Sequence, residues 1–396
     1  MSPLPLAFRV IHAAENIKGG VGTYLRDLVV AQRASFGEGS VVVVVPESQS
    51  DILASPVGVE VVTFDDRGPR WRSTLRLAAC MRGVMARVDA SVVHLHSTFA
   101  GLALRPLLRW APALRGCGPV VVYCAHGWSF DRETSLASRH LAMMLERALA
   151  PACDAIVCIS GHELRLARQA GIPARRLTHV ANGIPLQTPR SASNTRLPEW
   201  PADKRRLLFV GRFDRQKGVD ILLDALRALR DSTFAYLVGS AVLGDGALLE
   251  LPSNVRTTGW LSGPDLAAFY ETADVLVAPS RWEGFGLTAV EAMRAGLPVI
   301  ATRVGGLAEV VDHGVTGLLV EPNSSAALVE AIRSARAESL KSMGEAGRRR
   351  FVEHFTLDRV HAQLTALYQR LGAQKGLGQE GRPGPAHAQP ESSPHA

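Results

Sequence analysis

The sequence predicts an α/β protein made of two consecutive doubly wound parallel sheets that face a central cleft. Short runs rich in valine and isoleucine alternate with amphipathic stretches of helical period along most of the chain. Continuous apolar runs of this kind are typical of parallel strands that are buried on both faces. A polar, proline-rich break interrupts the alternation near its middle. The length of 396 residues fits two to three domains of ordinary size.

The first α/β unit is expected over residues 1–186, and the break at 187–204 is expected to be a linker. Strands are expected at 6–12, 41–45, 59–64, 92–96, 120–124, 155–159 and 178–181. Helical patterns lie between several of them, for example at 22–34, 75–88 and 136–149.

The second unit is expected over residues 205–371, and its final helix is a candidate to pack back on the first unit. Strands are expected at 206–210, 234–238, 254–258, 275–278, 299–301 and 317–320, and helices at 219–230, 265–272, 287–295 and 325–336. Ser262 and Pro264 form a favourable helix start. Residues 372–396 are rich in glycine, proline and glutamine, so we expect a disordered tail there.

The composition excludes several classes of protein. With 47% hydrophobic and 20% charged residues, the chain is not intrinsically disordered. No apolar run reaches the roughly 18 residues that a membrane span needs, and the first ten residues do not resemble a signal peptide. The five cysteines form no C-x-x-C pair. We therefore expect a cytoplasmic protein with reduced cysteines and neither disulfides nor a zinc site.

The net charge of +7 is concentrated in one part of the sequence. Between residues 67 and 115 a single acid, Asp89, stands against nine arginines, at 67, 70, 72, 76, 82, 87, 105, 109 and 115. Such a surplus favours contact with an anionic membrane or an anionic substrate, although a solvated basic face remains an alternative. No nucleic-acid-binding motif accompanies it, so a nucleic acid partner is not expected.

The first motif, KGGVGTY at 18–24, follows the first expected strand and opens a helix. Glycines such as Gly20 let the backbone approach a ligand, and the helix N-terminus offers free N–H groups to an anion. The motif is not G-x-G-x-x-G, so it lacks the dinucleotide fingerprint, and a purely structural tight turn is the alternative.

The second motif, GRFDRQKG at 211–218, directly follows the first strand of the second unit. Arg212 and Lys217 stand five residues apart around a turn at the carboxyl end of that strand. A guanidinium fork and an ammonium in this arrangement can clamp a diphosphate. Ordinary surface charge is the alternative.

The third motif, PSRWEGFGLTAVEA at 279–292, runs from a strand into a helix. Its Gly-Phe-Gly segment would present N–H groups at the helix N-terminus, which suits a phosphate. Glu283 precedes the helix, where a carboxylate could meet sugar hydroxyls or a developing positive centre. Glu291 lies inside the helix and could accept hydrogen bonds from a ribose diol. Both acids could instead be ordinary helix residues.

Two further strand ends carry candidate residues. In AHGW at 125–128, His126 could hydrogen-bond a sugar, although a lone histidine is more often structural. Gly305, Gly306 and Glu309 are interpreted as a turn that shapes the same cleft. No Asp-x-Asp pair occurs, so we expect positive side chains and a helix terminus to replace a metal ion. No G-x-S-x-G elbow occurs either, which argues against that class of hydrolase.

Taken together, these residues resemble the retaining, metal-independent glycosyltransferases of family 4, which have the GT-B fold of two Rossmann-like domains. The resemblance covers residues 6–371 and is most specific at EGFG (283–286) with Glu291, and at Gly211-Arg212 with Lys217-Gly218. GGVGT at 19–23, AHG at 125–127 and VGGLAE at 304–309 contribute to the match. The acceptor side carries no motif of this kind.

The resemblance implies a role for each matched position. Arg212 and Lys217 would hold the donor diphosphate and stabilise the leaving group, Glu283 would contact the donor sugar, and His126 would bind its 6-position region. These four residues are the expected catalytic set. The expected donor-binding set comprises Gly20, Leu261, Phe285, Gly286, Leu287, Thr288 and Glu291; Leu261 would contact the base, and Glu291 the ribose. Neither a metal nor another cofactor is expected.

The resemblance also implies an activity: transfer of a sugar from a UDP- or GDP-linked donor to a glycan or lipid-linked acceptor. Relatives with a basic first domain often act at the inner face of the cytoplasmic membrane, so we expect peripheral contact there and a role in bacterial exopolysaccharide, capsule or lipopolysaccharide synthesis. Two alternatives remain. One is another enzyme with this fold, such as a nucleotide-sugar epimerase or a phosphorylase, and the other is an inactive partner subunit of a polysaccharide assembly complex.

Overall fold

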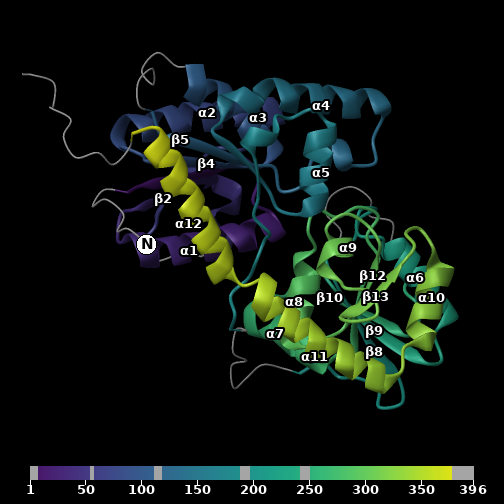
Figure 1. Cartoon of the computed structure of the whole chain (residues 1–396). Helices are drawn as coiled ribbons and strands as arrows, with labels where there is room; N and C mark the ends of the chain where they lie inside the picture. The colour runs from purple at the N-terminus through teal and green to yellow at the C-terminus, as the bar shows by residue number, and fades with distance from the viewer. Residues whose placement is uncertain (1–7, 54–57, 111–117, 188–196, 241–249, 377–396) are drawn as a thin grey trace, which may run out of the picture.

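The chain folds into two parallel sheets, each with helices on both faces (Figure 1). This computed structural model describes residues 8–53, 58–110, 118–187, 197–240 and 250–376. Within these ranges the first sheet has seven strands in the order β3-β2-β1-β4-β5-β6-β7, and the second has six in the order β10-β9-β8-β11-β12-β13. The predicted fold class is confirmed.

Each expected strand has a counterpart. The first sheet contains β1 Val10–Ala14, β2 Val41–Pro46, β3 Glu60–Phe64, β4 Val92–His96, β5 Val120–Cys124, β6 Ala155–Cys158 and β7 Leu177–His179. The second contains β8 Arg205–Val210, β9 Thr233–Val238, β10 Val255–Gly259, β11 Val275–Ala278, β12 Val299–Thr302 and β13 Gly317–Val320. The first strand begins and ends later than the expected 6–12, and residues 1–7 lie outside the described ranges.

Helices connect the strands of both sheets. Around the first sheet lie α1 Gly20–Phe36, α2 Arg70–Arg87, α3 Thr98–Trp110, α4 Leu136–Leu149 and α5 Gly161–Gln169. Around the second lie α6 Val219–Ala228, α7 Gly263–Thr272, α8 Leu287–Ala295, α9 Leu307–Val310, α10 Ser325–Ser334 and α11 Ala337–His354, and α12 Leu357–Gln374 follows. We refer to each sheet with its surrounding helices as the first and second domain.

The order of the strands fixes where a ligand can enter. In each sheet the order in which the strands are added reverses beside the first strand. The reversal lies between β1 and β4 in the first sheet and between β8 and β11 in the second. In open α/β sheets the loops on either side of such a reversal diverge and leave a crevice at the carboxyl ends of the strands. The motifs at 18–24, 211–218 and 279–292 follow β1, β8 and β11, so all three lie at these two reversals.

Some helices were not expected from the sequence because they contain residues that weaken the helical pattern. Pro106 lies inside α3, and α11 contains Gly344 and Gly347. In α11 the missing side chain is required by packing, since a Cβ on Gly344 would lie 2.0 Å from the carbonyl oxygen of Gly296. Glycine destabilises a helix by about 1 kcal/mol, and here it allows α11 to contact the end of α8 closely.

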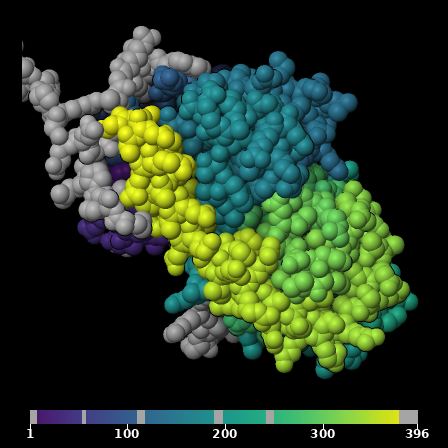
Figure 2. Space-filling model, viewed as in Figure 1, coloured from purple at the N-terminus to yellow at the C-terminus, as the bar shows by residue number. Residues whose placement is uncertain are grey.

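The C-terminal helix α12 leaves the second domain and lies along the first (Figures 1 and 2). It packs against α1, and the hydroxyl group of Tyr368 is 2.6 Å from Nδ1 of His94 on β4. Beyond α12, Lys375 pairs with Asp154 at 2.6 Å. The expected tail therefore begins too early, because Gly372 and the two following residues are helical.

The two chain segments that cross between the domains are joined to each other. The main-chain N–H of Ile184 donates to the carbonyl of Phe355 at 3.0 Å, and that of Leu357 donates to Ile184 at 2.8 Å. The described end of the expected linker, 197–204, runs along the second domain, where Trp200 packs on Tyr236 and donates to Thr272. Residues 188–196 of that linker lie outside the described ranges.

The arginine-rich segment carries less unpaired positive charge in the structure than the count in the sequence indicates. Ion pairs join Arg67 and Arg76 to Asp65, Arg70 to Glu15, Arg87 to Glu60 and Arg105 to Glu146. These acids lie outside the counted window, so the count overstated the free positive charge. Arg115 lies outside the described residues. Cys80, Cys124, Cys153 and Cys158 are free thiols. None of the described helices is long and apolar enough to cross a bilayer.

Candidate active site

The loop between β8 and α6 places two cations at the carboxyl end of the second sheet. Arg212 pairs with Asp214 at 3.1 Å and donates to the amide oxygen of Gln216 at 2.7 Å. Lys217 donates to Oε2 of Glu283 at 2.5 Å, and both side chains are largely buried. The structure thus brings together Lys217 and Glu283, which come from separate motifs.

The loop that carries Glu283 is held from behind by the glycine turn after β12. The N–H of Gly306 donates to the carbonyl of Glu283 at 2.9 Å. Gly305 has φ = 46°, and a Cβ at this residue would lie 1.9 Å from the same carbonyl oxygen. Only glycine combines this backbone conformation with so close an approach. The turn therefore sets the position of Glu283, as expected from its place in the sequence.

Two helix N-termini meet across the cleft. Gly20 is the first residue of α1, Leu287 is the first residue of α8, and a Cβ on Gly20 would lie 3.1 Å from Cδ1 of Leu287. Neither helix has a side-chain cap; the residues before them, Gly19 and Gly286, both have positive φ. Uncapped first-turn N–H groups and the positive ends of two helix dipoles therefore point at one place.

The remaining residues of the third motif divide between core and cleft. Phe285 is buried and packs on Phe355 of the second domain with ring centroids 5.8 Å apart, so its side chain is part of the core and only its backbone can serve a ligand. Thr288 is half-buried in the first turn of α8.

Glu291 lies one turn further into α8 and is half-buried. It accepts a hydrogen bond of 2.7 Å from Tyr270 of α7. Burial raises the pKa of Glu291, and the Tyr270 hydrogen bond opposes this shift. Leu261, in the loop after the edge strand β10, is half-buried against the core of the second domain.

His126 comes from the first domain and faces the Glu283 loop. It has φ = 54°, a conformation that costs a non-glycine residue about 1 kcal/mol or more and is concentrated at functional sites. A Cβ on Gly284 would lie 3.3 Å from Cα of Gly127, so the loops after β5 and β11 are in contact. Burial lowers the pKa of His126 to about 4, so the ring is neutral at physiological pH.

Two polar residues of this cleft, Arg132 and Glu163, were not among the expected site residues. The pKa of Arg132 is lowered by desolvation and by the charges of Arg212 and Arg70, so cations of both domains lie near one another. Glu163, at the start of α5, is buried; burial raises its pKa to about 7, and its Oε1 has no hydrogen-bond partner among the described residues. No local sequence pattern marks either residue as part of a site.

Glu309, previously assigned to the glycine turn, connects the domains. Its Oε2 accepts from the N–H of Gly161 at 2.7 Å, and its Oε1 accepts from Arg165 at 2.8 Å. An acid of the second domain thus occupies the N-terminus of α5 in the first, where a carboxylate is electrostatically favourable.

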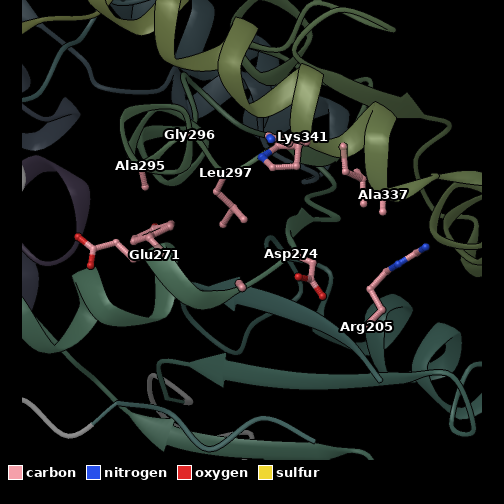
Figure 3. A pocket seen from close by; sticks show the side chains of 12 residues that line it. Arg205, Glu271, Asp274, Ala295, Gly296, Leu297, Ala337 and Lys341 are labelled. Atoms are coloured by element: carbon pink, nitrogen blue, oxygen red, sulfur yellow. The ribbon is translucent and has the colours of Figure 1, made fainter. Parts of the chain in front are cut away.

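A cavity of about 370 Å³ lies elsewhere, at the amino ends of β8, β11 and β12, away from the carboxyl ends that carry the motifs (Figure 3). None of the expected site residues lines it. Two of its polar groups are paired within the protein, since Arg205 donates to the carbonyl of Ala335 and Asp274 binds Arg206. We therefore place the site at the cleft and not in this cavity.

The cleft as a whole is suited to a phosphorylated ligand with hydroxyl groups. Two helix N-termini, Arg212 and Lys217 supply positive charge, which stabilises a diphosphate. Glu283 and Glu291 supply acceptors for hydroxyl groups, and His126 approaches from the opposite domain. All of these groups are fixed before a ligand binds, which lowers the cost of organising them around developing charge.

Comparison with known proteins agrees with this geometry. The chain is 33% identical over 329 residues to an uncharacterized 41.2 kDa protein in the cps region of Klebsiella pneumoniae, which covers 82% of this chain and 89% of the relative. Sucrose-phosphate synthase from Thermosynechococcus elongatus superposes with a TM-score of 0.79 at 25% identity, over 92% of this chain and all of that one. HepE of Anabaena, in complex with UDP-glucose, superposes with a TM-score of 0.75 at 20% identity, over 91% of this chain and 99% of that one.

Two family models match, one on each domain. Residues 18–188 match the model described as glycosyltransferase family 4, and residues 204–337 match the model described as glycosyl transferases group 1. Together the models include each of the expected catalytic residues. The chain therefore belongs to the group 1, family 4 glycosyltransferases, with the GT-B fold.

Proposed function

We propose that this glycosyltransferase is a retaining, metal-independent enzyme that moves a hexose from a UDP- or GDP-linked donor to a glycan or lipid-linked acceptor. One observation carries the proposal: Gly20 of α1 and Leu287 of α8 bring two uncapped helix N-termini together beside Lys217 and Glu283. That arrangement fits a diphosphate with a sugar attached better than it fits a single anion or a neutral sugar.

The proposed reaction follows from the charges. The bond between the anomeric carbon and the diphosphate breaks, and its electron pair remains on the phosphate oxygen. Lys217, Arg212 and the N–H groups of α1 and α8 would stabilise this negative charge, and each such group commonly contributes a few kcal/mol. The acceptor oxygen would bond to the anomeric carbon, and its proton would pass to the departing phosphate oxygen, while Glu283 would face the positive sugar ring. We assign no enzymatic nucleophile.

The donor class is supported by a structural neighbour. The solved HepE protein, which shares this fold, holds UDP-glucose. In the present chain, Glu291 on α8 would accept a ribose hydroxyl, and Leu261 is the candidate for contact with the base.

The side chains of the cleft support metal independence. Lys217 and Arg212 provide the positive charge that a divalent cation would otherwise bring to the leaving phosphate. We expect activity to survive EDTA. A loss of turnover that Mg²⁺ or Mn²⁺ restores would contradict this part of the proposal.

The acceptor is proposed to be lipid-linked and reached at the inner face of the cytoplasmic membrane. Helix α2 exposes Trp71 and Leu75, at 60% and 61% of their surface, and α4 exposes Leu136, Leu141 and Met144. Arg72 and Arg82 are exposed on α2. Apolar side chains among cations are typical of proteins that rest on an anionic bilayer. The relative in the cps region supports a role in capsule or related polysaccharide synthesis.

A panel of nucleotide sugars, scored by nucleotide release and then by mass spectrometry of the product, tests the activity. We expect release only when an acceptor is present, and a product heavier than the acceptor by one hexose. Interconversion of the donor without acceptor would indicate an epimerase. Absence of nucleotide-sugar binding by calorimetry would indicate an inactive subunit.

Flotation with vesicles tests the membrane contact separately. The protein should float with vesicles that contain anionic lipid at low salt, and Trp71→Ala combined with Leu75→Ala should weaken this. The matched control is Val352→Ala, because Val352 is an exposed apolar residue of α11. Protein that stays in the soluble fraction with anionic vesicles at low salt would contradict the membrane contact but not the transferase activity.

A further inference from the structure

A continuous chain of hydrogen bonds runs from His126 at the cleft into the core of the first domain. Nε2 of His126 is 2.8 Å from Nδ1 of His96, and Nε2 of His96 is 2.9 Å from Nδ1 of His12. Nε2 of His12 is 2.6 Å from Oε1 of Gln32 on α1. His12, His96 and Gln32 have no exposed surface, so water cannot replace any of these inner bonds.

The donors and acceptors along this series of hydrogen bonds are all determined once its buried end is fixed. A neutral imidazole donates from one nitrogen and accepts at the other, so the role of each ring determines that of the next. Gln32 presents an oxygen, which accepts; hence His12 donates from Nε2 and accepts at Nδ1. By the same logic His96 and His126 each donate from Nε2, and Nδ1 of His126 keeps its lone pair.

The structure sets the Gln32 amide with its oxygen toward His12, and the amide nitrogen is buried without a hydrogen-bond partner among the described residues. Burial raises the pKa of Tyr368 on α12, and the Gln32 side chain opposes this shift. Burial also lowers the pKa of His12 to about 4, and that of His96 well below its usual value, so both rings are neutral.

Two other uses of these rings fit the structure less well. A proton relay would need a group that takes up a proton at its inner end, and a glutamine amide does not. Ring nitrogens of His12, His94 and His96 lie within 4.8 Å of one another, a spacing that a metal ion could use. A dication there would break the His12–His96 bond and place its charge in a buried core, which is costly.

We propose that Gln32 is a positioning residue that acts through His12 and His96 to fix the tautomer of His126, with the proton on Nε2 and a lone pair on Nδ1. Among the described residues the bond to His96 is the one hydrogen bond recorded for the His126 ring, which leaves Nδ1 for a ligand. His126 is then a hydrogen-bond acceptor toward the cleft. Resting on the proposed function, we infer that Nδ1 of His126 recognises a donor-sugar hydroxyl by accepting a hydrogen bond from it, and that His126 does not act as a general acid.

Ring-nitrogen NMR of the protein labelled with ¹⁵N-histidine tests the proposal without any substrate. The signals of His12, His96 and His126 are assigned by their loss in single His→Gln variants. All three rings should show a protonated Nε2 and an unprotonated Nδ1 at pH 7. A proton on Nδ1 of His126 in the wild-type protein would overturn the proposal.

The variant Gln32→Met keeps the volume of the side chain and removes the amide oxygen. We expect the His126 signals to shift toward a mixture of tautomers, and kcat/KM for sugar transfer to fall about two- to tenfold, because only the correct tautomer is competent. The matched control is Leu28→Ala, one turn earlier on the same buried face of α1. It should lower the melting temperature but leave the His126 tautomer and kcat/KM unchanged.

The two kinds of failure are distinguishable. An unchanged His126 spectrum in folded Gln32→Met would overturn the positioning role even if the enzyme transfers sugar as proposed. A shifted spectrum in a protein that transfers no sugar would support the positioning role and contradict the proposed function instead.

Discussion

Each domain contains an ion pair in which both side chains are largely buried, and the surroundings of these two pairs differ. In the first domain Arg105 pairs with Glu146 at 2.7 Å, and the two side chains are 0% and 1% exposed. Tyr123 donates to the second oxygen of Glu146, and its ring lies under the Arg105 guanidinium. In the second domain Lys217 pairs with Glu283 at 2.5 Å, and the side chains are 18% and 14% exposed.

The difference separates a structural pair from a functional one. The Arg105–Glu146 pair is enclosed between α3, α4 and β5, so a ligand cannot reach it. The Lys217–Glu283 pair lies where the two domains and two helix N-termini meet, and under the proposed function the diphosphate donor would take the place of Glu283 beside Lys217. We therefore expect the first pair to support folding and the second to serve the ligand, and the following experiments test that distinction.

The largest expected effect is on stability. Glu146→Ala leaves the Arg105 charge buried without its partner, so the free energy of unfolding should fall by about 3–5 kcal/mol. Urea denaturation measures this. The double variant Arg105→Met with Glu146→Leu should recover most of the loss, and the folded protein should keep its kcat/KM. A stable Glu146→Ala protein would show that the pair is not structural.

The Lys217–Glu283 pair should behave in the opposite way. Lys217→Ala removes a cation aimed at the leaving phosphate, so kcat/KM should fall about 10²- to 10³-fold while the melting temperature changes little. Lys341→Ala is the matched control, because Lys341 lines the cavity at the amino ends of the strands (Figure 3). Wild-type turnover in Lys217→Ala would contradict the proposed role of this residue.

Glu163 sharpens the comparison because it is a buried acid without a cation. Burial raises its pKa from 4.5 in the unfolded chain to about 7, so the folded protein holds the proton more tightly. The protonated Glu163 carboxyl contributes stability that is fully present below pH 4.5 and is lost as the pH rises through about 7. Glu163→Gln cannot lose a proton, and above pH 7 it should be more stable than the wild type by roughly 3 kcal/mol. Urea denaturation from pH 4.5 to 8 measures the difference, with the exposed Glu345→Gln as the control.

The smallest expected effect concerns the meeting of the two helices. In Gly20→Ala the new methyl group would lie 3.1 Å from Cδ1 of Leu287, so the Leu287 side chain, and with it the first turn of α8, must move by a few tenths of an ångström. We expect donor affinity to fall about tenfold, since bidentate phosphate contacts depend on position. Leu287→Ala in the same protein should restore part of it, and a double-mutant cycle by calorimetry measures the coupling. Additive effects would show that the two helices do not share the ligand.

The strands could be predicted from the sequence because parallel strands buried on both faces are continuous apolar runs. β2 at Val41–Pro46 is such a run. The second-domain site could be predicted for a related reason, since Arg212 and Lys217 share one loop and Glu283 and Glu291 share one segment. Contiguous residues at a strand end keep their proximity whatever the tertiary packing.

The buried hydrogen-bond chain behind His126 could not be predicted in the same way. His12, His96 and Gln32 lie on β1, β4 and α1, and only the register of β1 against β4 brings the two histidines together. On a buried strand each histidine is indistinguishable from an ordinary core residue. Similarly, the charge of Arg76 could not be judged from its own segment, because its partner Asp65 precedes the helix.

The path of α12 has a consequence for how the protein is made. The strands of the first domain leave the ribosome early, but Tyr368, which covers His94, is synthesised only after the whole second domain. Domains generally fold as they emerge. Here the first domain emerges before α12 is synthesised, so the surface that α12 covers stays exposed until the end of synthesis.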